Sequence, residues 1–237
     1  MITVSHLTKR YGKVIALNNV SVVFDDMRVY AIMGENGAGK STLLKIIAGI
    51  LPYDQGDVSI DSFSIQTQSL MARERLGYLP EMPDLYDRIT GREFLFYIAS
   101  LRKISGAEQI IDSLSRTIGI DQALDYEIGG YSKGMKQKIS LLSAIMHQPQ
   151  NLLLDEPVYG LDPLASRTIQ DFIKKRQGTT VIATHSTQLV EQVADIVYFL
   201  MQGNVVLKDT SLHLIDQHGT IENAYFYHKE QTEKIKI

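Results

Sequence analysis

Residues 34–42 read GENGAGKST, a glycine-rich run that contains one lysine and two hydroxyl side chains. The pattern GxxxxGK[ST] predicts a phosphate-binding loop when a buried strand precedes it and a helix follows it. Glycines allow backbone N–H groups to surround a polyphosphate, while Lys40 adds a positive charge and Ser41 a hydroxyl suited to Mg²⁺. The helix N-terminus adds further positive potential. We therefore predict that this stretch binds a nucleoside triphosphate.

The residues on either side of this loop supply the strand and the helix that the pattern needs. Residues 29–33 are VYAIM, an apolar run typical of a buried strand. Residues 41–48 place four apolar side chains at helical spacing, so this context disfavours a chance glycine-rich turn. The candidate nucleotide-binding residues of the loop are Gly34, Asn36, Gly37, Ala38, Gly39, Lys40, Ser41 and Thr42.

Three polar residues elsewhere also follow apolar runs that read as strands. Asp155 and Glu156 end the run at residues 151–154, and His185 follows residues 179–183. Strands that alternate with helices predict a mainly parallel sheet, and such sheets bind ligands at the carboxyl ends of their strands. Because two adjacent buried acids are costly without a cation, Asp155 is a candidate Mg²⁺ ligand.

Each of these residues has a simpler interpretation that the sequence alone leaves open. Asp155 could be a capping carboxylate, and Glu156 could bind a metal through water instead of accepting a proton from an attacking water. A histidine at a strand end is more often a buried core residue than a catalytic one.

The composition sets limits on the kind of protein. With 237 residues, of which 44% are hydrophobic, the chain can form a substantial core, either as one domain or as one domain with an inserted lobe. A net charge of −3 argues against a nucleic-acid surface, and the lack of cysteine excludes disulfides and cysteine metal sites. We see no signal-peptide profile and no apolar stretch of ~20 residues, so we expect the chain by itself to be soluble.

The hydrophobic pattern divides the chain into four parts. Alternating residues predict a β-layer around the loop in residues 1–82, and helical spacing predicts an inserted helical subdomain at 83–131. Residues 132–215 return to strands and helices, including a helix that Asp162 caps. In residues 216–237 we expect a small closing helix at 220–227 and then a solvated tail.

Together these residues resemble the ATP-binding cassette (ABC) family over nearly the whole chain. The matching elements are the Walker A motif (34–42), the signature sequence (132–137), the Walker B motif (152–155) with the following carboxylate Glu156, the D-loop (160–163) and the switch histidine His185. The resemblance implies an α/β fold, a P-loop NTPase with a RecA-like core and mainly parallel sheet, an N-terminal antiparallel β-layer and an inserted all-helical subdomain.

The resemblance also implies roles for individual residues. Glu156, His185 and Lys40 would be catalytic, with ATP as substrate. Tyr11 would stack on the adenine, although an aromatic in a β-turn is often only surface packing. Ser132 and Gly134, at a helix start suited to anions, would cap the terminal phosphate that a second ATPase subunit binds. The implied assembly is a head-to-tail homodimer or heterodimer.

Two residues depart from the commonest form of the family. Lys133 stands where the signature usually has glycine, and it adds positive charge near the phosphate. Glu81 stands where the family usually has glutamine, and a carboxylate there would bind Mg²⁺ more strongly than an amide, so the metal candidates are Ser41, Asp155 and Glu81. Both variants resemble the branch of ABC exporters whose permease is a separate chain.

The resulting hypothesis is an ATPase subunit that drives a separate membrane permease. The permease would hold this subunit on the cytoplasmic face of the cell membrane. The permease would dock on the helical subdomain, where Leu85, Tyr86, Phe94 and Tyr97 are candidates either for its groove or for core packing. The main alternative is a regulatory or mechanical subunit that signals through a membrane partner without transport. An ABC protein acting on DNA or ribosomes and a guanine-reading GTPase are both disfavoured because their characteristic insertions or motifs are lacking.

Overall fold

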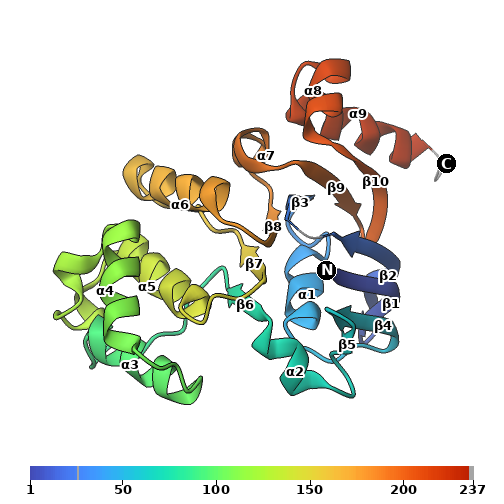
Figure 1. The fold of residues 1–237 in the computed structure, drawn as a ribbon. Coiled ribbons are helices and arrows are strands. Elements are labelled where there is room, and N and C mark those ends of the chain that lie inside the picture. The colour runs from blue at the N-terminus through green and yellow to red at the C-terminus, as the bar shows by residue number, and fades with distance from the viewer. Residues whose placement is uncertain (26, 235–237) are drawn as a thin grey trace.

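The computed structural model describes residues 1–25 and 27–234, which form two β-sheets and the helices that cover them (Figure 1). Among these residues the larger sheet has six strands in the order β10-β9-β3-β8-β7-β6, and all neighbours are parallel except β9 and β10. This is the mainly parallel sheet that the sequence predicts. Its strands are β3 (Val29–Met33), β6 (Leu76–Leu79), β7 (Asn151–Asp155), β8 (Thr179–Thr184), β9 (Ile196–Met201) and β10 (Asn204–Thr210).

The smaller sheet is antiparallel and has the order β2-β1-β4-β5. Buried Leu17, Val20, Val22 and Phe24 alternate with exposed neighbours, as expected of a strand with one face in the core. The predicted N-terminal β-layer is therefore confirmed. Its strands are β1 (Ile2–Tyr11), β2 (Val14–Phe24), β4 (Gln55–Ile60) and β5 (Phe63–Ser64).

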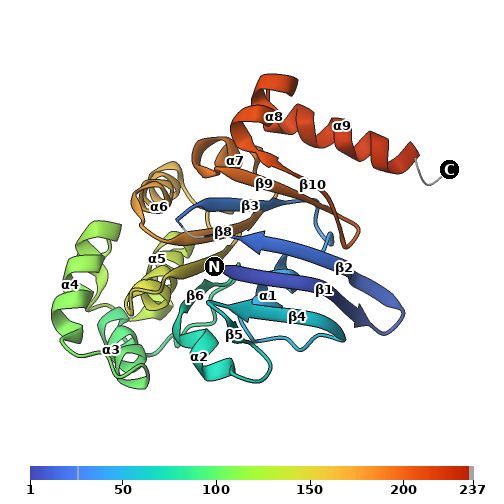
Figure 2. The same ribbon diagram turned by 45° about the vertical axis from the view of Figure 1, so that its right-hand side comes forward.

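Helix α1 (Lys40–Ile47) lies between the two sheets, as Figure 2 shows. The side chains of Leu43, Leu44, Ile46 and Ile47 are all fully buried, in one cluster with residues of both sheets. Because this helix is packed on two sides, the loop that precedes it is attached to the hydrophobic core.

The remaining helices lie around this core (Figure 1). Residues 83–131, which include α3 and α4, are called the helical block below. Helices α3 and α4 pack on one another and on α5, away from the antiparallel sheet, and Thr90 caps α3 in a reciprocal pair with Glu93. No helix among the described residues has both the length and the apolar content to cross a bilayer. The helices are α2 (Ser69–Glu74), α3 (Gly91–Leu101), α4 (Ala107–Ile118), α5 (Lys133–Ile145), α6 (Pro163–Lys175) and α7 (Thr187–Val193), with 3₁₀ turns at Asp121–Ala123 and Ile128–Gly130.

The C-terminal segment differs from the prediction. Two helices follow β10, α8 (Ser211–His218) and α9 (Ile221–Lys234), so the expected small helix at 220–227 is too short and α8 was missed. The first part of α9 packs on the sheet through buried Ile221, Ala224 and Tyr225, and farther along the helix the ring of His228 lies 5.9 Å from that of Phe199. Its later residues are polar, so they have no hydrophobic periodicity to reveal the helix. Residues 235–237 of the predicted tail lie outside the described part of the chain.

Candidate nucleotide-binding and hydrolysis site

A cavity of about 490 Å³ lies where β3, β6, β7 and β8 end, next to the β1–β2 hairpin. Its walls come from five separate stretches of sequence, which the fold brings to one edge of the parallel sheet. The candidate residues that line it are Tyr11, Asn36, Gly37, Gly39, Lys40, Ser41, Thr42, Glu81, Glu156 and His185.

The shape of the loop before α1 depends on glycine at two positions. A Cβ atom added at Gly34 would lie 2.3 Å from the carbonyl oxygen of Leu200. Gly39 has φ +107°, and a Cβ there would lie 2.5 Å from the carbonyl oxygen of Ala16. No side chain caps the N-terminus of α1, so its first N–H groups can bind an anion.

The Lys40 side chain folds back onto this loop, so that its ammonium group contacts the loop backbone. The Nζ atom donates to the carbonyl oxygens of Gly34 at 2.8 Å and Glu35 at 3.1 Å, and it lies 3.9 Å from Oε1 of Glu156. Burial lowers the pKa of Lys40, while the nearby carboxylates oppose that change. The ammonium group is thus placed at the wall of the cavity where phosphate oxygens would enter.

Ser41 and Asp155 form the pair of oxygen donors that Mg²⁺ would need. The Ser41 Oγ donates to Oδ1 of Asp155 at 2.9 Å, and Asp155 is only 1% exposed. The pKa of Asp155 is raised to about 6, chiefly by burial and in addition by the charges of Glu81 and Glu156, while the Ser41 hydrogen bond opposes the rise. Two adjacent buried carboxylates, Asp155 and Glu156, with exposed Glu81 at the same cavity, fit a divalent cation, which would relieve their mutual repulsion.

Glu156 is oriented by its backbone and by three donors. Its φ of +47° is unusual for a residue other than glycine and turns the side chain back toward the end of β8. Thr184 Oγ1 donates to Oε2 at 2.8 Å, and the backbone N–H of His185 donates to Oε1 at 3.0 Å. The His185 Nδ1 atom also lies 2.7 Å from Oε1. The carboxylate is therefore fixed at the cavity wall.

His185 is not a buried core histidine, because 44% of its side chain is exposed and it lines the cavity. Since Nδ1 is engaged with Glu156, Nε2 is the ring nitrogen that can meet a ligand. The structure thus brings His185, Glu156 and Lys40 together at one end of the cavity.

The β1–β2 hairpin forms the opposite wall. Tyr11 is half-exposed there, with the Lys9 ammonium 5.3 Å from the centre of its ring, beside exposed Val14 and Ile15. An aromatic ring beside aliphatic side chains offers a flat apolar surface of the kind a nucleobase stacks on. Stacking by Tyr11 stays a prediction.

Ser132 and Gly134 lie apart from this group, since neither lines the cavity. Ser132 is exposed and accepts a hydrogen bond from the Met135 N–H at 3.2 Å, which caps α5. Gly134 is buried, and a Cβ there would lie 3.3 Å from that of Ala165. The two residues thus lie at a second, separate helix start outside the cavity, where Ser132 is exposed and Gly134 is buried.

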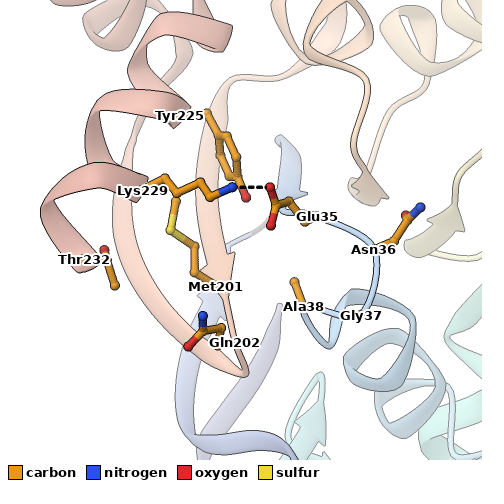
Figure 3. Close-up of a pocket in the computed structure, with 9 residues that line it drawn as sticks. All are labelled: Glu35, Asn36, Gly37, Ala38, Met201, Gln202, Tyr225, Lys229 and Thr232. Carbon is orange, nitrogen blue, oxygen red and sulfur yellow. Dashed lines mark hydrogen bonds and ion pairs between the residues drawn. The ribbon is translucent and has the colours of Figure 1, made fainter. Parts of the chain in front are cut away.

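A second cavity, of about 190 Å³, lies on the side of the loop that faces α9 (Figure 3). Gly37 lines both cavities, whereas Ala38 lines only the second of these two. There Lys229 of α9 donates to the Glu35 carboxylate at 2.5 Å, and Tyr225 lies beside the pair. The C-terminal helix therefore contacts the phosphate-binding loop directly.

The structure adds two site residues that the sequence analysis does not name. One is Thr184, whose hydrogen bond to Glu156 depends on how β7 and β8 pair. Tyr159 lines the cavity beside His185. Its position between Glu156 and Gly160, in the loop after β7, is the signal that could have identified it.

Comparison with known proteins agrees with this geometry. A model of the ABC transporter family matches residues 17–159. The ABC transporter ATP-binding protein NatA of Bacillus subtilis (strain 168) is 32% identical over 96% of each chain. The bacitracin transport ATP-binding protein BcrA of Enterococcus faecalis is 32% identical over 87% of this chain and 68% of its own.

Solved structures give the same result for the fold. A structure of the ATP-binding subunit of an ABC transporter superposes with a TM-score of 0.88 and 29% identity, covering 97% of this chain and 99% of that one. A dimeric bacterial ABC transporter cassette shares the fold with a TM-score of 0.82, at 23% identity over 89% and 98%. The chain belongs to the ABC transporter family, as one of its ATP-binding subunits.

Proposed function

We propose that this subunit hydrolyses ATP and thereby drives a separate membrane permease that exports its substrate. The observation that carries the proposal is the placement of Lys40, Glu156 and His185 at one end of a single cavity. A lysine, a fixed carboxylate and a histidine at a phosphate-binding loop are the groups that phosphoryl transfer to water requires.

In the reaction we propose, a water molecule attacks the terminal phosphorus atom and the bond from that atom to the ADP oxygen breaks. Glu156 orients the water and accepts its proton, because the carboxylate is held toward the cavity by Thr184 and His185. His185 contacts the terminal phosphate through Nε2, and Lys40 offsets the negative charge that the phosphate oxygens carry.

Ser41 and Asp155 would hold Mg²⁺, with Glu81 as a further carboxylate at the cavity. Among the described residues no group of three His, Cys, Asp or Glu side chains could hold a metal by itself, so phosphate oxygens and water would complete the shell. The ion would neutralise phosphate charge and help to orient the triphosphate.

We further propose that two copies of the chain dimerise head to tail around two ATP molecules. Ser132 and Gly134 support this assembly, because they lie at a helix start, a position suited to anions, outside the chain's own cavity. In the dimer each helix start would contact the terminal phosphate bound by the other copy. A fold relative of this chain is a dimeric cassette.

A permease would place the dimer on the cytoplasmic face of the membrane, and the residues 83–131 are its proposed docking region. Tyr86 and Tyr97 are exposed there and meet edge to face at 6.3 Å, whereas Phe94 is 6% exposed and belongs to the core. Export is favoured by the exporter-like motifs around Glu81 and Ser132 and by relatives named for bacitracin and lantibiotic transport.

Steady-state ATP hydrolysis by the purified chain tests the proposal. The Glu156→Gln variant keeps the shape of the side chain but removes the base, so it should bind ATP normally and lose at least about 100-fold in kcat. Glu108→Gln on the exposed side of α4 is the matched control and should keep wild-type activity. Wild-type turnover in the Glu156→Gln variant would contradict the assigned chemistry.

A further inference from the structure

We propose that Tyr159 is a positioning residue that fixes the ring of His185, and that Lys133 holds Tyr159 in place. The inference rests on the proposed hydrolytic function and assigns it two residues that the family resemblance does not. It connects the helix start at Ser132 with the histidine of the same chain through a continuous series of side-chain contacts.

The contact between Tyr159 and His185 has a defined geometry. Their ring centres lie 5.4 Å apart with an angle of 65° between the planes, which is an edge-to-face arrangement. The backbone N–H of Tyr159 donates to the carbonyl oxygen of Glu156 at 3.2 Å. This short turn returns Tyr159 to the side of the cavity where the Glu156 carboxylate and His185 meet.

Lys133 contacts the same tyrosine from the start of α5. Its Nζ atom lies 4.7 Å from the centre of the Tyr159 ring, within the range of a cation–π interaction. A Cβ added at the neighbouring Gly160 would lie 2.6 Å from this Nζ, so the lysine side chain lies directly over the turn. Glycine at position 133, the commonest residue of the family there, could make neither contact.

The ring of Tyr159, not its hydroxyl, carries the interaction. Within the described residues the hydroxyl has no hydrogen-bond partner, and the side chain is 52% exposed at the cavity wall. Tyr159 therefore adds little burial, and what its ring supplies is an edge-to-face contact with the imidazole and a face to the Lys133 ammonium.

His185 needs this second contact because one hydrogen bond leaves the imidazole free to tilt. The bond between Nδ1 and Glu156 fixes one atom of the ring, but rotation about that bond still changes where Nε2 points. The contact with the tyrosine ring restricts this tilt and keeps Nε2 directed at the terminal phosphate. Small losses of orientation in catalytic groups lower kcat more than they lower substrate affinity.

Steady-state kinetics of the full-length chain test the inference. Tyr159→Leu, which removes the ring and keeps apolar bulk, should lower kcat about three- to tenfold while KM for ATP changes less than about twofold. Tyr159→Phe restores the ring and should recover kcat. Tyr126→Leu, at an exposed tyrosine of the helical block, is the matched control. An unchanged kcat in Tyr159→Leu would overturn the inference.

The contact between the two rings can be measured without turnover. In a carbon–proton NMR spectrum of histidine-labelled protein, the His185 ring signal should move in Tyr159→Leu and stay near its wild-type position in Tyr159→Phe. The signal is assigned by its loss in His185→Gln. A His185 signal that is the same in Tyr159→Leu and wild type would contradict the proposed contact.

A double-mutant cycle tests the role of Lys133. If Lys133 acts through the tyrosine, Lys133→Gln should lower kcat in the wild type but have little further effect in the Tyr159→Leu background. Equal losses in both backgrounds would contradict this link. A wild-type chain that hydrolyses no ATP would contradict the proposed function, whereas a change in the NMR signal would still support the positioning contact.

Discussion

The Nδ1 atom of His185 lies 2.7 Å from Oε1 of Glu156, and the backbone N–H of the same histidine donates to that oxygen at 3.0 Å. Two groups of one residue thus hold one oxygen of the carboxylate, and Thr184 holds the other at 2.8 Å. The end of β8 therefore orients the acid that follows β7. This relationship depends on the parallel pairing of the two strands, in which Asp155 lies opposite Ala183.

Thr184→Val should impair hydrolysis without impairing binding. Valine has nearly the same shape but cannot donate to Oε2 of Glu156. The carboxylate therefore loses one of the hydrogen bonds that fix its orientation. We expect kcat to fall about tenfold, which corresponds to ~1.4 kcal/mol, with KM for ATP changed less than about twofold. Thr117→Val, at an exposed threonine of α4, is the control. A Thr184→Val enzyme with wild-type kcat would show that this hydrogen bond has no catalytic role.

Alanine substitutions at two glycines of the phosphate-binding loop should have unequal effects. At Gly39 the new Cβ would meet the backbone of Ala16, whereas at Gly37, φ +82°, it would meet nothing within 4 Å. Gly37→Ala should cost about 1 kcal/mol of unfolding free energy through backbone strain alone. Gly39→Ala should cost at least twice as much, because the β1–β2 hairpin must also move. Equal denaturant midpoints for the two variants would refute the steric argument.

His147 should make the stability depend on pH in a defined range. Burial, helped by the charge of Arg102, lowers the pKa of His147 to about 4, below the ordinary value of 6.5. Between these values the unfolded chain binds a proton that the folded chain does not, so the histidine makes stability fall as pH drops from about 6.5 to 4. Above that range both states are neutral and the effect vanishes.

The check is the unfolding free energy of His147→Gln measured across that pH range. Glutamine can still donate to the carbonyl oxygen of Leu76, which lies 3.1 Å from the His147 Nε2, but it does not titrate. The variant should lose less stability than the wild type on acidification, by on the order of 1 kcal/mol. Parallel pH profiles for the two proteins would be inconsistent with a buried neutral histidine.

The contact between Lys229 and Glu35 should couple the C-terminal helix to the phosphate-binding loop only weakly. The pair is 2.5 Å long but partly exposed, and such ion pairs contribute about 0–1 kcal/mol. A double-mutant cycle with Lys229→Met and Glu35→Gln, measured by denaturation at low salt, should give a coupling energy in this range that decreases in high salt. A coupling above about 2 kcal/mol, or one that does not respond to salt, would contradict the assignment as a screened surface pair.

Local patterns account for most of what the sequence predicts correctly. The strand at Val29–Met33 and the helix at Lys40–Ile47 each carry a clear hydrophobic pattern, so the phosphate-binding loop between them could be placed from sequence. The strand-end positions of Asp155 and His185 likewise followed from short buried runs, and the parallel topology brings both to the same edge of the sheet.

The missed features depend on contacts between distant segments. The polar half of α9 is joined to the loop by Lys229 and Glu35, which are 194 residues apart. The Tyr159 ring contacts Lys133 and His185 at the cavity, and both residues come from other parts of the sequence. Helical spacing could not separate Phe94, which is buried, from exposed Tyr97, because both lie on α3 and only the packing of its neighbours decides between them.

We propose that two copies of the chain share each ATP site. The mass of the Glu156→Gln variant in solution shows directly whether two copies associate when ATP is bound. Light scattering on this variant at saturating Mg-ATP should give twice the 26.6 kDa of the single chain, and adding Ser132→Arg should return the mass to 26.6 kDa. A Glu156→Gln particle that binds ATP fully yet keeps the mass of one chain would contradict the account.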